Sequence, residues 1–297
     1  MLNLKDLKYL VALADTGHFG KAAERCYVSQ PTLSAQLKKL EQYLGVQLVE
    51  RQPNNVQLTE VGRKVVERAR GMLRSGEEII ALARDNKDPL SGTLKVALIP
   101  TVGPYLLPRM TQKVRRALPH MGLMLYEHQT APLLKKLNDG EIDLGILALP
   151  VPEDGLVTRE LYNEAFLLAV PEGDPLAARS RVRLTDLKDR TLLLLEDGHC
   201  MREQALEVCS LVETREADNF RATSLETLRM MVVAGLGVTL LPQLAVEPPF
   251  GTQRGLKVVP FVNPHPIRSI GAIWRKSTTR LQAITAVCDV IDRVMRH

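Results

Sequence analysis

The 297-residue chain contains only four cysteines: Cys26, Cys200, Cys209 and Cys288. This number is too small for the disulfide framework of a secreted scaffold, and it favours a reducing compartment in which thiols stay free. No uncharged apolar run approaches the roughly 20 residues that a membrane-spanning helix needs. The first residues also lack the apolar core of a signal peptide. We therefore expect a cytoplasmic protein with no membrane partner.

Several motifs of catalysis and ligand binding are missing as well. The sequence has no nucleophilic serine elbow, no glycine-rich phosphate loop and no cluster with the spacing of metal ligands. We therefore expect no metal and no cofactor. Hydrophobic residues make up 45% of the chain, enough for a large core, and the length predicts two domains. The net charge of +5 permits a polyanionic partner without requiring one.

The first 62 residues have the pattern of a small helical domain with a β-hairpin. Apolar residues at helical spacing predict helices over residues 4–16, 19–27 and 29–44. Short strands are expected over residues 46–49 and 56–58, around a turn at residues 53–55. Ser29 is a good N-cap for the third helix, and Gly45 ends it. The pattern fits either a plain helical domain or a winged helix-turn-helix.

The third helix carries polar residues on the faces turned away from its leucines. Hydroxyls and amides can bond to base edges in DNA, and lysines can reach phosphates. Taken alone, such a face could equally be a solvated surface. The candidate DNA-binding residues are Ser29, Gln30, Pro31, Thr32, Ser34, Gln36, Lys38 and Lys39.

A longer helix is predicted from Thr59 to about Asn86. Small and apolar residues recur along it with the heptad period of a helix that pairs with another helix. The alternative is burial of this seam against the helix's own chain. The seam consists of Val65, Ala69, Met72, Gly76, Ile79 and Ala83. The segment Asp88–Gly92 ends the helix and is the best domain boundary in the sequence.

Beyond Gly92, strand and helix patterns alternate, which favours an α/β domain with a mostly parallel sheet. Strands are expected over residues 93–99, 123–127, 142–147, 166–170, 192–195, 238–241 and 270–274. Helices are expected over residues 106–118, 133–139, 225–234 and 281–295.

Two of the cysteines, Cys200 and Cys209, are separated by nine positions. If the segment between them is helical, its rise of about 1.5 Å per residue puts their Cα atoms roughly 13 Å apart. A disulfide needs Cα atoms within about 4.4–6.8 Å. The pair can therefore be thiols in one backbone conformation and a disulfide in another, so its oxidation would change the shape of the chain.

The surroundings of Cys200 favour a reactive thiolate. A predicted strand ends near Leu195, Gly198 permits a tight turn, and Cys200 follows at or just before a helix start. The helix dipole and the neighbours His199 and Arg202 favour the charged form. A thiolate attacks peroxide to give a sulfenic acid, which condenses with a second thiol.

The cysteines have two other possible roles. A cysteine in a cytosolic protein is usually a small buried hydrophobe, the interpretation that fits Cys26 and Cys288. A zinc site built from His199, Cys200 and Cys209 is disfavoured, because adjacent His and Cys lack the usual ligand spacing.

The N-terminal segment resembles the DNA-binding domain of LysR-type transcriptional regulators. The resemblance is carried by residues 7–10, 17–23, 28–34, 39–41, 44–46, 48–51, 58–59 and 62. It implies a winged helix-turn-helix over residues 1–62, whose third helix, with Arg51 of the wing, contacts double-stranded promoter DNA. It also implies a linker and dimerisation helix with a hinge over residues 63–92.

Residues 93–297 resemble the regulatory domain of the same family, two α/β lobes of the periplasmic-binding-protein kind. The first lobe is expected over residues 93–164 and 267–297, and the second over residues 165–266. Residues 98–108, 196–200, 209 and 221–229 are similar to the hydrogen-peroxide-responsive members. That resemblance implies a peroxidatic Cys200 and a resolving Cys209. The implied helpers at the peroxide site are Thr101, Thr130, His199, Arg202 and Arg268.

The resemblance thus implies a peroxide-sensing activator of oxidative-stress genes rather than an enzyme. Its disulfide would change the arrangement of subunits, in a homotetramer built as a dimer of dimers. The implied partners are RNA polymerase and a thiol-disulfide reductant such as glutaredoxin or thioredoxin. Two alternatives stay open: a family member that senses a metabolite in the lobe cleft, and a thiol peroxidase.

Overall fold

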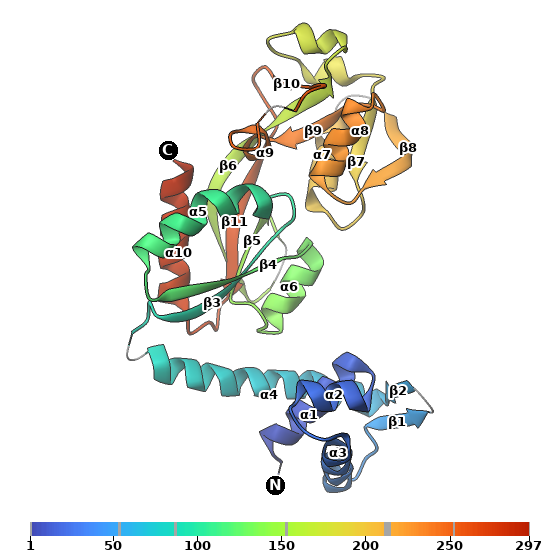
Figure 1. Cartoon of the computed structure of the whole chain (residues 1–297), viewed down its shortest axis with the longest axis vertical. Helices are drawn as coiled ribbons and strands as arrows, with labels where there is room; N and C mark the ends of the chain where they lie inside the picture. The colour runs from blue at the N-terminus through green and yellow to red at the C-terminus, as the bar shows by residue number, and fades with distance from the viewer. Residues whose placement is uncertain are drawn as a thin grey trace. The chain divides into compact units, whose positions relative to one another are not determined.

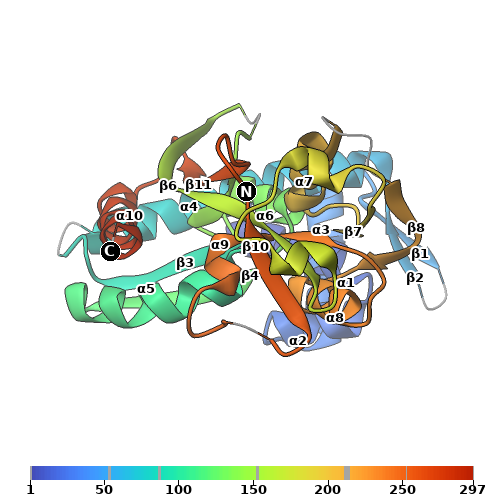
Figure 2. The same cartoon turned by 90° about the horizontal axis from the view of Figure 1, so that it is seen from above.

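The computed structural model describes residues 2–52, 55–85, 88–151, 154–210, 215–251 and 253–296. Residues 53 and 54 of the predicted turn lie outside this set, as do the side chains of Arg51 and Cys209. The chain forms two compact units, residues 1–87 and 88–297, which are described separately (Figure 1, Figure 2). Among the described residues, no helix is long and apolar enough to cross a membrane.

The first unit contains the three predicted helices, the hairpin and the long helix. Their bounds are α1 Leu4–Thr16, α2 Phe19–Arg25, α3 Gln30–Leu44, β1 Val49–Gln52, β2 Asn55–Leu58 and α4 Glu60–Asp85. Local signals end the helices: Gly17 and Gly45 both cap in the left-handed conformation, which suits glycine. Leu10, Leu33 and Leu37 are fully buried in the core of this unit.

The heptad positions of the long helix α4 are buried near its start and exposed farther along. Ala69 is buried and Val65 is partly buried against the core of the first unit, where α4 packs on α1. Met72 and Ile79, one heptad apart, are 47% and 67% exposed. Burial against the same chain therefore accounts for the start of the seam and leaves its middle uncovered.

The second unit is a mixed α/β structure. Its helices are α5 Gly103–Ala117, α6 Thr130–Asn138, α7 Cys200–Ser210, α8 Leu225–Val233, α9 Gln243–Val246 and α10 Leu281–Met295, with 3₁₀ turns Pro175–Ala178 and Leu184–Leu187. Its strands are β3 Gly92–Leu98, β4 Met121–Glu127, β5 Leu144–Leu149, β6 Leu156–Pro171, β7 Thr191–Leu195, β8 Arg215–Ala222, β9 Thr239–Pro242, β10 Leu256–Pro260 and β11 Ile267–Arg275.

The main sheet has the strand order β10-β6-β11-β5-β3-β4, and β9 also pairs with β6. Only β3 pairs in parallel within it, with β4 and β5. The other pairings of the sheet are antiparallel, so the expectation of a mostly parallel sheet is wrong. The reason is the pair β6 and β11, which run side by side in opposite directions between the two lobes (Figure 1).

Strand β6 changes partners along its length. Residues 156–165 pair with β11, whereas residues 166–171 pair with β9 and β10. The predicted strand over residues 166–170 is therefore only the last part of a 16-residue strand. The division into lobes at residues 164/165 and 266/267 stays a prediction about domain limits.

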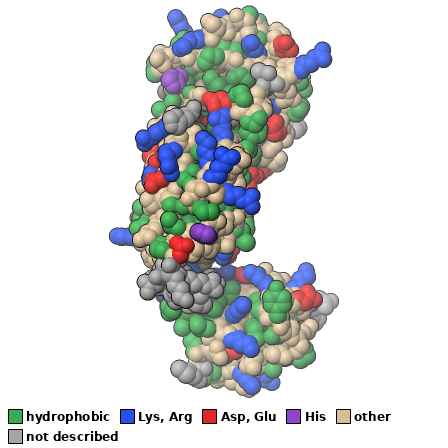
Figure 3. All heavy atoms as spheres, turned by 60° about the vertical axis from the view of Figure 1, so that its left-hand side comes forward, with side chains coloured by type: hydrophobic (Ala, Val, Ile, Leu, Met, Phe, Trp, Pro, Cys, Tyr) green, Lys and Arg blue, Asp and Glu red, His purple; other side chains and the backbone are tan. Residues whose placement is uncertain are grey.

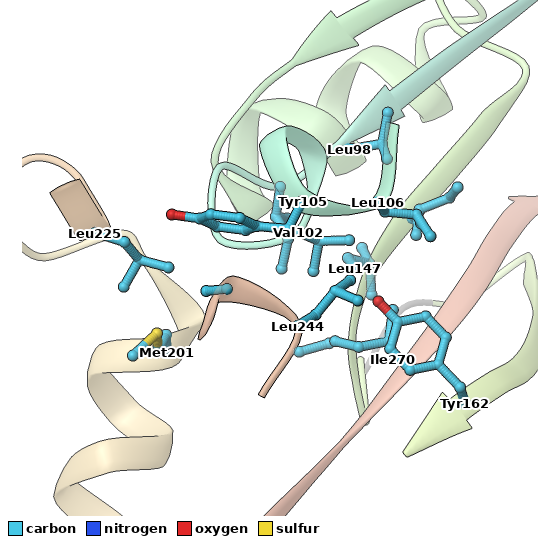
Figure 4. Close-up of a cluster of buried hydrophobic side chains, with 14 of the residues drawn as sticks. Leu98, Val102, Tyr105, Leu106, Leu147, Tyr162, Met201, Leu225, Leu244 and Ile270 are labelled. Carbon is cyan, nitrogen blue, oxygen red and sulfur yellow. The ribbon is translucent and has the colours of Figure 1, made fainter. Parts of the chain in front are cut away.

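One continuous hydrophobic core serves this whole unit. Figure 4 shows part of it, where Tyr105 and Leu106 of α5 lie with Leu244 of α9 and Ile270 of β11. Met201, the second residue of α7, belongs to the same core and is 2% exposed. The beginning of α7 is therefore anchored in the packed interior.

Candidate functional site

The polar face of α3 is open to a macromolecular partner. Gln30, Lys38 and Lys39 are exposed, whereas the leucines of the opposite face are buried. The Ser29 hydroxyl accepts the backbone N–H of Thr32 at 3.3 Å, so the predicted N-cap is present. Of the other candidates, Pro31 and Thr32 are exposed and Ser34 and Gln36 are half-buried.

The hairpin beside α3 is fixed by a carboxylate. Glu41 Oε1 accepts the backbone N–H groups of Leu48 at 2.8 Å and Val49 at 3.2 Å, which ties the start of β1 to α3. Arg51 follows in β1. Basic side chains are scattered over the visible face of the first unit instead of forming one dense patch (Figure 3).

Cys200 lies where a strand, a tight turn and a helix meet. β7 ends at Leu195, Gly198 has a φ of +95°, and Cys200 is the first residue of α7. The left-handed backbone conformation favours glycine, and a Cβ atom at this position would lie 2.8 Å from Gln129 Oε1, so the Gln129 side chain would have to shift. The Cys200 thiol is free and half-buried.

Helix α7 extends to Ser210 and so includes Cys209. At about 1.5 Å per residue, the nine steps separate the two Cα atoms by roughly 13 Å. The helix predicted from the spacing is present, and in it the cysteines are too far apart for a disulfide.

Two sequence neighbours of Cys200 lie near carboxylates. Arg202 is buried, and its Nε lies 3.0 Å from Asp197 Oδ1 in the turn before the helix. His199 Nε2 lies 3.9 Å from Glu196 Oε1. Burial is the main cause that lowers the pKa of His199, with the nearby carboxylates opposing it. His199 is therefore a neutral polar group at pH 7, and not a second cation beside the thiol.

Arg268 and Thr101, 167 positions apart, are joined by hydrogen bonds. Arg268 Nη1 donates to Thr101 Oγ1 and Nη2 donates to the Thr101 carbonyl, both at 3.0 Å. The guanidinium also forms a buried ion pair with Glu164, at 2.7 Å between Nη2 and Oε1. Sequence analysis did not identify Glu164 as a site residue. The feature that identifies Glu164 is the pairing of the two strands, because Glu164 directly faces Arg268 in the β6–β11 pair.

Cys200 and Arg268 line the same cavity, which has a volume of about 560 Å³. One face of α7 forms one side of it, and the segment leading into β11 forms another. The lining residues from α7 are Cys200, Glu203, Gln204, Glu207 and Val208, and those from the β11 side are Pro264, His265, Pro266, Ile267, Arg268 and Ser269. A cavity of this size admits a small ligand or oxidant to the thiol.

The remaining candidates, Thr101, Thr130, His199 and Arg202, do not line this cavity. His199 lines a separate cavity of about 520 Å³, together with Gln129 and Glu196. Thr130 is the first residue of α6, and its buried hydroxyl has no hydrogen-bond partner among the described residues. Among the residues that the structure describes, no three His, Cys, Asp or Glu side chains lie close enough together to hold a metal ion.

Two family models match the chain. "Bacterial regulatory helix-turn-helix protein, lysR family" matches residues 4–63, and "LysR substrate binding domain" matches residues 87–296. The chain is 46% identical over 274 residues to the "DNA-binding transcriptional dual regulator OxyR" of Escherichia coli, covering 92% of this chain and 90% of that one. It is 42% identical over 298 residues to the "Hydrogen peroxide-inducible genes activator" of Haemophilus influenzae, covering 99% of both.

Solved structures agree with these relatives. A full-length OxyR variant from Pseudomonas aeruginosa matches with a TM-score of 0.78 and 42% identity, covering 98% of this chain and 95% of that one. An oxidized form of OxyR matches 70% of this chain and 98% of its own, with a TM-score of 0.65 and 41% identity.

Proposed function

The chain belongs to the LysR family of bacterial transcriptional regulators, and within that family we propose that it is a DNA-binding activator that senses hydrogen peroxide through Cys200. One observation carries the proposal: a free, half-buried cysteine begins a helix beside a cavity, in a chain 42% identical over 99% of its length to a hydrogen peroxide-inducible activator. The protein acts as a regulator and not as an enzyme, and no cofactor is required.

The chemistry takes place at one sulfur atom. The Cys200 thiolate attacks one oxygen of hydrogen peroxide, the O–O bond breaks, and the products are a sulfenic acid and hydroxide, which takes up a proton to become water. The Cys209 thiol then attacks the sulfenic sulfur, which forms the disulfide and releases a second water. Thr101, Thr130 and His199 supply hydrogen-bonding groups, and Arg268 supplies a positive charge beside the thiol.

The disulfide cannot form while α7 is intact, because the helix holds the two cysteines roughly 13 Å apart. Oxidation therefore forces α7 to leave its helical path and moves its partly buried Leu206 and Val208 out of their packing. The displaced apolar groups repack on a neighbouring subunit and re-space the paired DNA-reading helices. A local bond thereby changes operator binding.

DNA binding is assigned to α3 and the hairpin of residues 1–62, with residues 63–92 pairing two subunits. Met72 and Ile79, exposed on α4, are the apolar positions that a partner helix would cover. The assembly is a dimer of dimers in the cytoplasm, which acts on promoter DNA with RNA polymerase. Glutaredoxin or thioredoxin returns the protein to the thiol form.

The test is a brief peroxide pulse followed by peptide mapping without reductant. Wild-type protein should yield a Cys200–Cys209 linked peptide and a changed footprint on DNA. Cys200→Ser should bind DNA with one footprint, with or without peroxide. A wild-type footprint that peroxide leaves unchanged would instead favour a metabolite sensor. Consumption of many equivalents of peroxide with a reductant present would indicate a thiol peroxidase.

A further inference from the structure

Glu164 is the only buried aspartate or glutamate among the described residues of the chain. A carboxylate loses its hydration when it is buried, and this costs several kcal/mol unless ion pairing and hydrogen bonds replace it. The side chains of Glu164 and its partner Arg268 are 5% and 1% exposed. A buried ion pair adds little net stability, so its position beside the sensing cysteine calls for a functional explanation.

Both members of the pair have several hydrogen-bond partners. Glu164 Oε1 accepts from Arg268 Nε at 2.8 Å, and its Oε2 accepts the backbone N–H of Leu244 in α9 at 3.1 Å. The outer nitrogens of the guanidinium donate to the hydroxyl and the carbonyl of Thr101. Phe166 adds a ring 5.7 Å from the guanidinium carbon. Glu164 therefore fixes the plane and the direction of the Arg268 side chain.

This arrangement also orients Thr101. A guanidinium can only donate hydrogen bonds, so the Thr101 hydroxyl oxygen must accept from Arg268. Its own hydrogen stays available for an acceptor other than Arg268. Thr101 thus becomes a donor in a defined direction, and it keeps this role only while Arg268 is held in place.

We propose that Glu164 is a positioning residue of the peroxide-sensing site, which holds Arg268 against Thr101 and offsets its charge so that Cys200 is only moderately activated. Arg268 lines the cavity that Cys200 also lines, which gives the guanidinium charge a path to act on the thiol in this proposal. The inference rests on the proposed function of Cys200. It adds that the reactivity of the thiol is set by a carboxylate that does not itself line the cavity.

Other charged and titratable groups also line this cavity. Glu203 and Glu207 come from α7, and His265 comes from the segment before β11. They stay unchanged in every variant of the test below, so a comparison between variants isolates the contribution of Glu164.

The test is the rate at which iodoacetamide alkylates Cys200 in the full-length reduced protein, measured by peptide mass spectrometry at pH 6 and pH 9.5. Glu164→Gln removes the negative charge and leaves Arg268 uncompensated, which stabilises the thiolate. Across a cavity of this size, with the thiol half-exposed, we expect alkylation at pH 6 to be about 3- to 10-fold faster than in the wild type. At pH 9.5, which is above the usual pKa of a free thiol, the rates should agree within about twofold.

Two further variants separate charge from packing. Glu247→Gln also removes a carboxylate of an ion pair, but its partner Arg109 does not line the Cys200 cavity, so it should leave both rates unchanged. The double variant Glu164→Gln with Arg268→Gln removes both charges. It should lose the excess rate at pH 6 if the effect of Glu164 acts through Arg268.

The proposal is overturned if Glu164→Gln raises both rates by the same factor, which is the mark of loosened packing, or if the double variant keeps the excess. Should Glu164→Gln fail to fold, Glu164→Asp keeps the charge, and the ratio of its rates at the two pH values must then match the wild type. Alkylation needs no peroxide, so failure here leaves the proposed function intact. A wild-type Cys200 that peroxide does not oxidise would instead refute the proposed function.

Discussion

The switch can be tested by changing the stability of α7 without touching either cysteine. Glu203 is exposed in the first turn of this helix, between the buried Met201 and Ala205. Glu203→Ala and Glu203→Gly both remove the carboxylate and leave neutral, small residues. In a helix interior they differ in helix propensity by about 1 kcal/mol, so the open form of α7 should be up to about fivefold more populated in the glycine variant.

This difference should appear in the second chemical step only. The sulfenic acid forms at Cys200 while the helix is intact, so both variants should reach it at the same rate. Closure onto Cys209 requires the open form, because the helix keeps the Cα atoms roughly 13 Å apart. We therefore expect the disulfide to form up to about fivefold faster in Glu203→Gly than in Glu203→Ala.

The assay is a single pulse of peroxide, quenched at intervals by acid and alkylation, with the sulfenic and disulfide forms counted by peptide mass spectrometry. Equal alkylation rates of Cys200 in the two reduced variants serve as the control. Hydrogen exchange over residues 200–210 measures helix opening independently. If exchange is faster in the glycine variant while the disulfide forms at the same rate in both, then opening of α7 is not required and the proposed switch is wrong.

Three further outcomes follow from the structure. Gln30→Ala should weaken specific DNA binding by about 1–3 kcal/mol. Lys38→Ala should weaken binding to all DNA sequences alike and lower the slope of log affinity against log salt concentration by about one. DNA-binding titrations at several salt concentrations distinguish the two effects. Burial raises the pKa of Cys288 to about 12, so iodoacetamide at pH 8 should modify Cys200 and spare Cys288; equal modification would mean that the core is open. Burial lowers the pKa of His199 from 6.5, so the unfolded state binds more protons than the folded state. The free energy of unfolding should therefore fall as the pH drops below 6.5. Denaturant titrations should show a weaker fall in His199→Gln, and an unchanged fall would exclude His199 as its source.

The sequence predicted best those features that depend on neighbouring residues. Ser29 and Gly45 delimit α3 as expected, because capping is a local interaction. The start of α7 at Cys200 followed from Gly198 and the end of the preceding strand. Cys200, Thr101 and Arg268 were named from the family resemblance, and the structure connects two of them by hydrogen bonds.

The features that the sequence did not predict depend on pairing between distant strands. β8 and β10 were missed, and β6 was recognised only in its last part. The direction of β11 against β6 cannot be found from periodicity, since parallel and antiparallel strands share the same alternation of side chains. The role of Glu164 depends on that register, because only the β6–β11 pairing places it opposite Arg268.

The two halves of the sensing site differ in how firmly they are held. Arg268 and Glu164 lie on strands that pair with each other over the whole of β11, and their buried contacts reach Thr101 and α9. Helix α7, in contrast, is anchored by Met201 and Ala205 on one face, while its other face lines a cavity of about 560 Å³. The helix face that borders unfilled space has few packing contacts to lose when the helix unfolds. Oxidation should therefore displace α7 while the β6–β11 register and the Arg268 contacts persist, so the site is ready to react again once the disulfide is reduced.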